Sequence, residues 1–427
     1  MLKLKKQKLI LSFLLSGLVS VPFFFKKESA FVEITDIENS LGIKTSIVDI
    51  KNNGVIYIKC KFKNAGVLHN QVDKHGISAI LGNLMFRKIN GLSSGETQEK
   101  MSELGLQYFF QNAFEDDFEV SFYVLKDKIE KALRFLSTAF TKSEFSKNDL
   151  EFMKEQFPRI LDIDSKPEEL MFEKLMNLLY VDHNYGLNNS GTAQAISSIT
   201  TNDINDSIKS NFAKDNLETL FVGEISKSEA KKYLDILFAQ LPETCKIRHE
   251  EKIRAKISNQ TTSVIKKPDM KDIVGVMCGV RIDDLTEIER AALYVVIESL
   301  YNKNGSFVKE LCSRNIAYKV NYSLLERSFS NVFYFYIFLE KQDLERYLKY
   351  LKTVVNNPLT IVNSLELERV KKYFMEQSIN GFANLTDFEK KNKRRNLPFE
   401  KINEQTLEKV IKKLYNNQQS KIVIIKD

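Results

Sequence analysis

The chain has 427 residues, of which 43% are hydrophobic and 11% aromatic, a composition that excludes a disordered protein. Its length exceeds what one hydrophobic core usually supports, so two or three domains are expected. The formal net charge is +7, but residues 1–30 hold six lysines and one glutamate, which leaves about +2 for the rest. This balance gives no electrostatic footprint for nucleic acid.

Residues 1–30 have the order of a bacterial secretory signal. A basic start, MLKLKKQK, is followed by the apolar run LILSFLLSGLVSVPFFF and by polar KKESA. Glu28 weakens the cleavage site before Ala30, and the apolar run is long enough for a short anchor. The sequence therefore predicts an exported protein, either periplasmic or held in the inner membrane, facing the periplasm, through residues 1–30. No other stretch is long and apolar enough to span a membrane.

The chain holds four cysteines, at positions far apart and without a C-x-x-C pair: Cys60, Cys245, Cys278 and Cys312. Export would permit disulfides. Cys60 and Cys278 lie in strand-like runs, however, and have the pattern of buried apolar residues. No disulfide is predicted.

The chain repeats itself loosely at a period of roughly 200–215 residues. Residues 199–224 align without gaps to residues 402–427, and each segment predicts a helix, a turn and a strand. An aromatic strand leads into an amphipathic helix at 117–140 and again at 330–355. The repeat predicts two tandem homologous domains of roughly 200 residues, with α+β architecture. Each is expected to be an antiparallel-rich sheet with helices packed on one face.

The predicted domain boundaries follow from this repeat. The first domain is expected over residues 31–242 and the second over residues 263–427. The charged segment 243–262, ETCKIRHEEKIRAKISNQTT, lacks a firm apolar period and is the predicted linker.

HGISAILGNLMFRK, residues 75–88, predicts a core helix. One stripe of this helix is formed by residues at helical spacing, namely Ile77, Ile80, Leu81, Leu84 and Met85. Ala79, Gly82 and Asn83 share a neighbouring face made of small residues. A glycine inside a helix costs about 1 kcal/mol relative to alanine, so this second face needs an explanation.

The residue patterns of common catalytic sites are missing. Zinc hydrolysis needs three protein ligands, but none of the four histidines (His69, His75, His183 and His249) pairs with another at helical spacing. Neither H-E-x-x-H nor H-x-x-E-H occurs, and no phosphate loop or G-x-S-x-G elbow is present. The acidic run Glu115–Asp116–Asp117 is interpreted as solvated turn residues. Nothing in these patterns favours an enzyme that acts alone, although a carboxylate hydrolase stays open.

The same helix resembles the motif G-x-x-H-x-x-E-H-x-x-F of the insulinase-like metallopeptidases, which include pitrilysin and the mitochondrial processing peptidases. Gly76 and Phe86 match the ends of the motif. The resemblance implies a two-domain clam-shell in which Ala79 and Asn83 replace the two zinc-binding histidines and Gly82 replaces the general base. It therefore implies no catalytic residue, no metal and no cofactor in this chain. Glu155 is the nearest candidate for the third zinc ligand of that family.

A second segment, YVVIESLYNKNGSFVKELCSRNIAYKVNYS, resembles the second-domain segment that ends in L-R-x-x-x-G-L-x-Y in the same family. The resemblance implies that Tyr318 contacts substrate. Cys312 stands where the family has its arginine, and Arg314 is the candidate that could replace it as a substrate-binding residue. The alternatives are a packing role for Tyr318 and a surface position at a helix end for Arg314.

Two functions of different classes follow from the resemblance. The first is a catalytically inactive subunit of a two-chain zinc metallopeptidase, with a homologous partner that keeps H-x-x-E-H. This subunit would supply wall and peptide-binding surface for unfolded peptides, which pair with a strand edge. The alternative is a stand-alone exported peptide-binding or envelope structural protein, as a monomer or homodimer. A peptidase with an unrelated site is the third possibility.

Overall fold

The computed structural model describes residues 34–38, 41–50, 54–112, 115–141, 145–163, 166–188, 191–246, 255–317, 319–377, 394, 396–416 and 419–427. The predicted targeting segment 1–30 and the predicted substrate contact Tyr318 lie outside these residues. Within the described part of the chain, no helix combines the length and the apolar character needed to cross a membrane.

The first half of the chain builds a six-stranded sheet in the order β1-β2-β6-β3-β5-β4. Neighbouring strands are antiparallel except for the parallel pair β2 and β6. The strands are β1 (Ile34–Glu38), β2 (Lys44–Asp49), β3 (Val55–Phe62), β4 (Leu106–Asn112), β5 (Phe118–Leu125) and β6 (Leu217–Gly223). The helices are α2 (Ile77–Leu84), α3 (Ser94–Glu103), α4 (Ile129–Thr141), α5 (Lys147–Ile163), α6 (Pro167–Leu179), α7 (Ala193–Ser198), α8 (Thr201–Asn211) and α9 (Lys227–Phe238).

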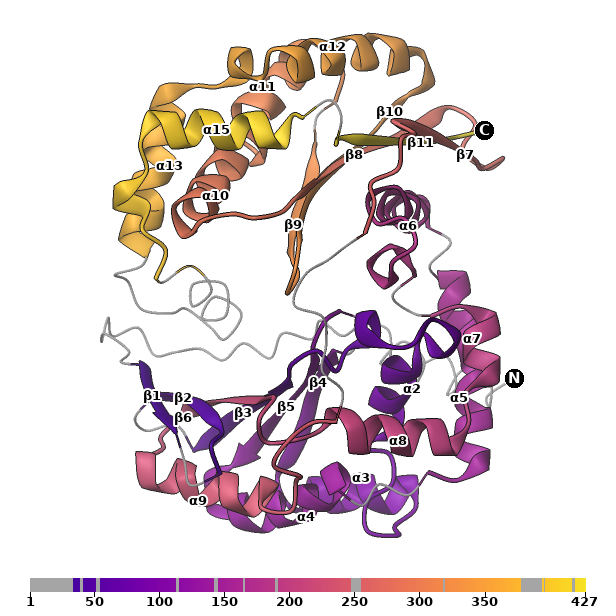
Figure 1. Cartoon of the computed structure of the whole chain (residues 1–427), viewed down its shortest axis with the longest axis vertical. Coiled ribbons are helices and arrows are strands. Elements are labelled where there is room, and N and C mark those ends of the chain that lie inside the picture. Colours follow the sequence, from indigo (N-terminus) through magenta and orange to yellow (C-terminus); the bar gives the residue numbers. More distant parts are fainter. Residues whose placement is uncertain are drawn as a thin grey trace.

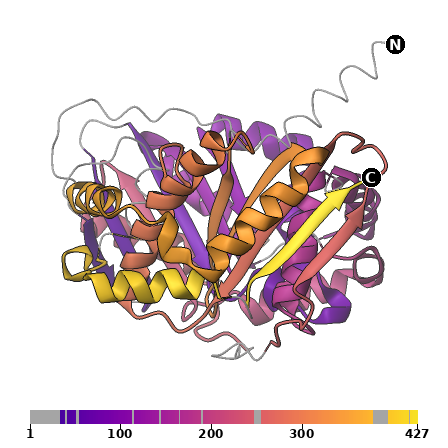
Figure 2. The ribbon, with the colours of Figure 1, turned by 90° about the horizontal axis from the view of Figure 1, so that it is seen from above.

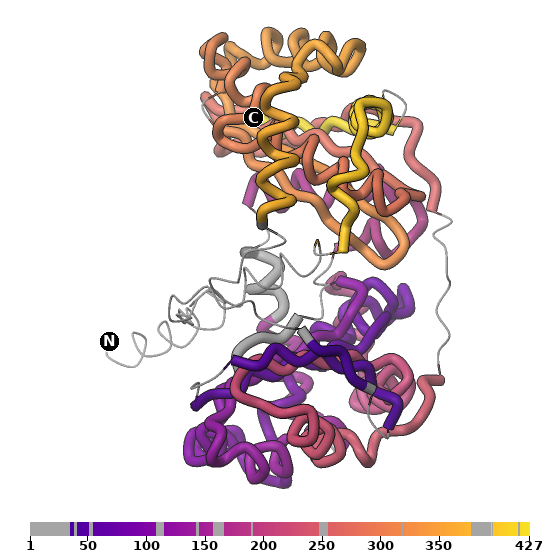
Figure 3. Tube along the Cα trace, turned by 90° about the vertical axis from the view of Figure 1, so that its left-hand side faces the viewer, coloured from indigo at the N-terminus to yellow at the C-terminus, as the bar shows by residue number. Residues whose placement is uncertain are grey.

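The second half builds a five-stranded sheet in the order β7-β11-β8-β10-β9, in which only β7 and β11 are parallel. Its strands are β7 (Thr262–Lys266), β8 (Ile273–Ile282), β9 (Asn321–Glu326), β10 (Asn331–Glu340) and β11 (Lys421–Lys426). Its helices are α10 (Glu287–Tyr301), α11 (Ser306–Ser313), α12 (Leu344–Asn356), α13 (Ser364–Gln377) and α15 (Glu404–Leu414). The two halves form two lobes, one above the other (Figures 1 and 3).

The two halves repeat one topology. The strand order β2-β6-β3-β5-β4 has its counterpart in β7-β11-β8-β10-β9. Helices α8 and α15 begin and end at positions that the gapless sequence alignment pairs, because Thr201 pairs with Glu404 and Asn211 with Leu414. Two α+β domains with antiparallel-rich sheets, as predicted from the sequence, are therefore present.

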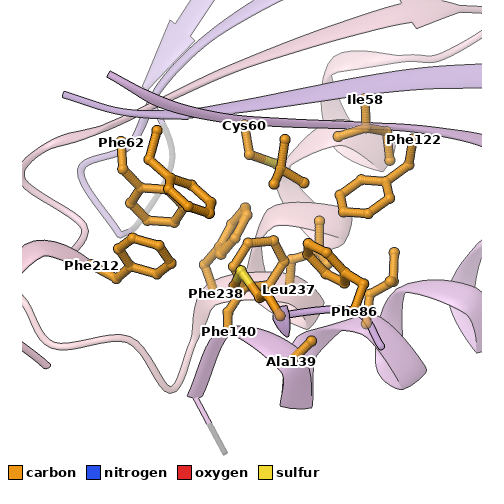
Figure 4. Packing of buried hydrophobic residues seen from close by; sticks show 14 of the residues in the cluster. Ile58, Cys60, Phe62, Phe86, Phe122, Ala139, Phe140, Phe212, Leu237 and Phe238 are labelled. Carbon is orange, nitrogen blue, oxygen red and sulfur yellow. The ribbon is translucent and has the colours of Figure 1, made fainter. Parts of the chain in front are cut away.

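The core of the first half lies between its sheet and its helices. Residues 58–62 of strand β3 alternate in burial, and Ile58, Cys60 and Phe62 point into this core (Figure 4). The ring of Phe62 stacks on that of Phe212, with centroids 4.2 Å apart. Burial raises the pKa of the Cys60 thiol, so this cysteine behaves as an apolar core residue. Among the described residues, no disulfide links the cysteines.

The second sheet is covered on both faces, whereas the sequence predicted helices on one face. One face packs on α10, α11, α12, α13 and α15, and seen from above α12 lies on the near side of the strands (Figure 2). The other face packs on α6, a helix from the first half of the sequence (Figure 1). Gly275 and Gly279 of β8 allow this close approach, because a Cβ at Gly279 would come within 2.5 Å of the Leu175 side chain.

Candidate functional site

Helix α2 carries the small-residue face that the sequence singled out. It spans Ile77–Leu84 and is shorter than the predicted 75–88, since turns follow Leu84. Gly76, at the N-cap, has φ +102°, a left-handed conformation that glycine adopts at no steric cost. His75 is fully buried, and its Nε2 lies 2.9 Å from the carbonyl oxygen of Asn188. Burial lowers the pKa of His75.

The three motif positions on α2 do not fit a zinc ion. Ala79 is 1% exposed and its methyl group belongs to the core of the first half. Gly82 is buried and offers no side-chain donor. Asn83 is exposed, and its Nδ2 donates to the carbonyl oxygen of Ala79 over 2.8 Å. Zinc takes thiolate, imidazole or carboxylate ligands, and α2 presents none of them at these positions.

The surroundings supply no replacement ligand set. Glu155, the candidate third ligand, lies on the exposed side of α5, a helix that packs against α2. In the described part of the chain, no group of three or more His, Cys, Asp or Glu side chains is placed to hold a metal ion. We therefore derive no zinc-dependent step for this chain.

The described sheets end in the edge strands β1 and β4 and the edge strands β7 and β9, and β4 and β9 lie at corresponding ends of the two repeats. Strand β4 ends the first sheet and pairs, among the described strands, with β5 alone. Its register shifts between Tyr108 and Phe110. Strand β9 ends the second sheet and pairs with β10. Edge strands present N–H and C=O groups that another strand can use.

Arg314 lies at the C-terminal end of α11, in the upper lobe and away from α2 (Figure 1). Its Nε donates to Oε1 of Glu310 over 2.8 Å, and its guanidinium lies 4.9 Å from the centre of the Tyr350 ring. The Cys312 thiol donates to the carbonyl oxygen of Ala317 over 3.3 Å. The structure thus engages Arg314 within the second half and does not bring it to the motif positions of α2.

A buried carboxylate, which belongs to the acidic run 115–117, lies where the two halves meet. Asp116 is only 4% exposed, so its interpretation as a solvated turn residue is wrong. Its Oδ1 lies 2.9 Å from His69 Nε2 and accepts the Tyr185 hydroxyl, and its Oδ2 accepts the backbone N–H of Ser328 over 2.7 Å. Burial alone would raise the pKa of Asp116, but the three hydrogen bonds hold it below its ordinary value.

Arg327 is the second buried charge at this junction. Its side chain is 1% exposed. Nε donates to Oε2 of Glu115 over 3.0 Å, and Nη1 donates to the carbonyl oxygen of Tyr185 over 3.0 Å. The guanidinium also lies over the rings of Tyr180 and Tyr185, 5.6 and 4.8 Å from their centres. These partners all lie in the first half of the chain, while Nη2 is buried and has no hydrogen-bond partner among the described residues.

Two family profiles match the chain. Residues 62–193 match the family described as "Insulinase (Peptidase family M16)", and residues 198–374 match "Peptidase M16 inactive domain". Both are descriptions of one peptidase family, and together they span most of the described chain.

Curated relatives are distant. The beta subunit of the mitochondrial-processing peptidase of Saccharomyces cerevisiae is 24% identical over 211 residues, which are 49% of this chain and 44% of that protein. This chain therefore spans less than half the length of that relative. An "Uncharacterized zinc protease" of Rickettsia felis is 22% identical over 343 residues, covering 79% of this chain and 81% of that one.

Solved structures share the whole fold. A peptidase M16 inactive-domain protein from Pseudomonas fluorescens superposes with a TM-score of 0.80 at 19% identity, covering 92% of this chain and 98% of that one. A protease from Helicobacter pylori gives a TM-score of 0.77 at 17% identity, covering 93% and 100%. At these identities the likeness concerns the fold. With both profiles and the duplicated topology in agreement, this chain belongs to the insulinase family of peptidases, family M16, and carries the N-terminal and C-terminal domains of that family.

Proposed function

We propose that this chain is a catalytically inactive subunit of a two-chain zinc metallopeptidase. One observation carries the proposal. On α2, where active members of the family are expected to hold two zinc ligands and a general base, Ala79 is packed in the core, Gly82 has no side chain and Asn83 bonds its own helix. The helix keeps its structural role, while the groups that would bind metal and move a proton are missing.

The proposed contribution of this chain is binding surface. An unfolded peptide pairs with the edge of a sheet, for which β4 and β9 are the candidates. Main-chain hydrogen bonds of this kind are insensitive to the peptide's sequence, which suits a subunit that presents many substrates to a catalytic partner.

The proposed partner is a homologous chain that keeps H-x-x-E-H. By its name, the yeast relative is one subunit of a larger peptidase, which supports a two-chain arrangement. The basic and apolar segment 1–30 supports export, so the partner is proposed to be an exported protein as well.

Purification from the native host tests this proposal. The chain is tagged at its C-terminus and isolated, and its stoichiometric partner is identified by mass spectrometry. Peptide cleavage is then measured with each chain alone and with both, with and without a chelator. The proposal predicts chelator-sensitive cleavage only when the partner is present. Cleavage by this chain alone, or stable isolation without any H-x-x-E-H chain, contradicts it.

A matched control separates binding from catalysis. The partner's H-x-x-E-H glutamate is replaced by glutamine, and the complex is purified again. The two chains are expected to stay together and to bind peptide, while cleavage is lost. Retained cleavage in this complex would place the active site elsewhere and overturn the assignment.

A further inference from the structure

The tip of the β9–β10 hairpin, residues Arg327–Ser330, reaches from the second half into the first. The tip is a tight turn closed by the Arg327 N–H, which donates to the carbonyl oxygen of Ser330 over 3.1 Å. Three of its four residues contact Glu115, Asp116 and His69 of the first half, and Ser330 contacts Tyr180 at the end of α6. Arg327 pairs with Glu115, and the Ser328 N–H bonds Asp116.

The other two tip residues extend this contact. The ring of Phe329 meets the ring of His69 edge-on, with centroids 5.9 Å apart. The Ser330 hydroxyl lies 2.8 Å from that of Tyr180, and it donates to Oδ1 of Asp283 over 2.5 Å. Charged, polar and aromatic contacts are therefore concentrated in one short turn.

The receiving surface is the matching turn of the first repeat. Residues 115 and 116 lie between β4 and β5, the counterparts of β9 and β10, so the two hairpins meet tip to tip. This turn is held by Gly66, whose backbone N–H donates to the carbonyl oxygen of Asp116 over 2.8 Å. A Cβ at Gly66 would overlap the carbonyl oxygen of Glu115, so only glycine permits this approach.

The buried charges make this junction sensitive to the loss of any partner. Asp116 is 4% exposed and the Arg327 side chain 1% exposed, so neither can recover its hydration if its partner is removed. Arg327 pairs with Glu115, whose side chain is 34% exposed, so losing the Glu115 charge leaves the buried guanidinium without its ionic partner, which is unfavourable.

Hydrogen bonds connect the receiving surface to α2. The short 3-10 helix η1 (Val67–His69) supplies His69 and is followed by Asn70. The Asn70 side chain receives the N–H of Ser78 on α2 over 3.1 Å and donates to the Ser78 hydroxyl over 2.7 Å. The Asn184 side chain, next to Tyr185, donates to the carbonyl oxygen of Asn70 over 2.5 Å. The start of α2 is therefore held by the same loops that hold the tip.

We propose that the hairpin tip 327–330 is an interdomain lock. It fixes the second half relative to η1 and to the start of α2. The edge strands β4 and β9 are thereby held in a fixed position relative to each other. The lock is a property of this chain by itself and does not depend on the proposed subunit role.

Hydrogen exchange read by mass spectrometry tests the lock, because amide protection reports local opening. The full chain is compared with Arg327→Met, which keeps an unbranched apolar stem but removes the guanidinium and its charge. Arg369→Met is the matched control, since Arg369 pairs with Glu366 on the exposed surface of one helix. Exchange is followed in peptides covering 327–330, 66–70, β3 and β8.

The lock predicts slow amide exchange at residues 327–330 in the unaltered chain. In Arg327→Met, exchange at 327–330 and at 66–70 should be about tenfold faster, while exchange in β3 and β8 stays unchanged. Arg369→Met should leave all four regions unchanged. Unprotected amides at 327–330 in the unaltered chain, or equal exchange in Arg327→Met, overturns the proposal. If Arg327→Met does not fold, Glu115→Gln, which keeps the shape of the partner, must give the same pattern, and unchanged exchange there also overturns the lock.

Discussion

The backbone N–H of Ser328 donates to Oδ2 of Asp116 over 2.7 Å, across 212 positions of sequence. The two residues occupy corresponding turns of the duplicated domains, between β4 and β5 and between β9 and β10. Duplication therefore gave the chain two similar hairpins, and the fold joins them at their tips with hydrogen bonds and the ion pair of buried Arg327 with half-buried Glu115.

Asp116→Asn is expected to destabilise the protein by roughly 2–4 kcal/mol. The amide keeps the shape but loses the charge that accepts from His69, Tyr185 and Ser328, and a charge-assisted bond in a buried site is worth more than a neutral one. Denaturant unfolding followed by circular dichroism measures the loss. Asp269→Asn is the control, since Asp269 is 69% exposed in its pair with Lys267 and should change stability by less than about 0.5 kcal/mol.

The ion pair of α10 with α15 should make stability depend on pH. Burial alone would raise the pKa of Glu289, but bonds from Lys409 and the Thr286 N–H, with the charge of Lys413, lower it to about 2 from an ordinary value of 4.5. A lowered pKa means that the stabilisation is complete above the unfolded value and is lost as pH falls towards the folded one.

Glu289→Gln should therefore cost about 1–2 kcal/mol at pH 7, the low range reflecting the exposed Lys409. The difference in unfolding free energy between the variant and the unaltered chain should shrink as pH is lowered through 4.5 towards 2. Urea unfolding at a series of pH values measures both. A difference that stays constant between pH 7 and pH 3 would show that the carboxylate charge is not the source of the effect.

Because α6 packs closely on β8, the stability losses caused by mutations on the two elements should not be additive. Gly279→Ala adds a methyl group within 2.5 Å of the buried Leu175 side chain and is expected to cost about 1–3 kcal/mol. Leu175→Ala leaves a cavity and should cost about 2–5 kcal/mol. In the double variant the added methyl group fills part of that cavity. The loss in unfolding free energy of the double variant should therefore be smaller than the sum of the two single losses by about 1 kcal/mol or more.

Unfolding free energies of the four proteins give this cycle. Gly95→Ala on α3 is the control, because nothing lies within 4 Å of the added methyl group and no loss is expected. Additive losses at Gly279 and Leu175 would contradict direct contact between α6 and β8.

Replacing the motif residues of α2 by the histidines expected in active family members should change stability by different amounts at positions 79 and 83. Ala79→His places an imidazole at a core position and is expected to destabilise the chain by about 1–3 kcal/mol. Asn83→His changes an exposed residue and should cost less than about 1 kcal/mol. Thermal unfolding distinguishes the two, and an equal loss for both would show that the two positions do not differ in burial.

The repeat and its helix positions could be predicted from the sequence because they depend on local apolar periodicity. The gapless pairing of 199–224 with 402–427 placed α8 and α15 at corresponding residues. Strand-like runs around Cys60 and Cys278 likewise indicated buried thiols, and both are buried.

The junction could not be predicted, because it depends on contacts between residues far apart in the chain. Asp116 lies in an acidic turn that resembles any solvated loop, and its partner Ser328 has no local signal. The position of α6 on the second sheet depends on Gly275 and Gly279, which leave room for Met171 and Leu175 of α6. The sequence alone does not show that these side chains pack on the two glycines. The predicted substrate contact Tyr318 lies outside the described residues, and the predicted role of Arg314 stays a prediction.

We propose that this chain lacks the groups that bind zinc and catalyse hydrolysis. The most direct test of this proposal measures zinc by elemental analysis and peptide cleavage on one preparation of the purified chain, before and after mixing with the proposed H-x-x-E-H partner. The account predicts no stoichiometric zinc and no cleavage for the chain alone, and chelator-sensitive cleavage in the mixture. One zinc per chain together with chelator-sensitive cleavage by this chain alone would contradict it.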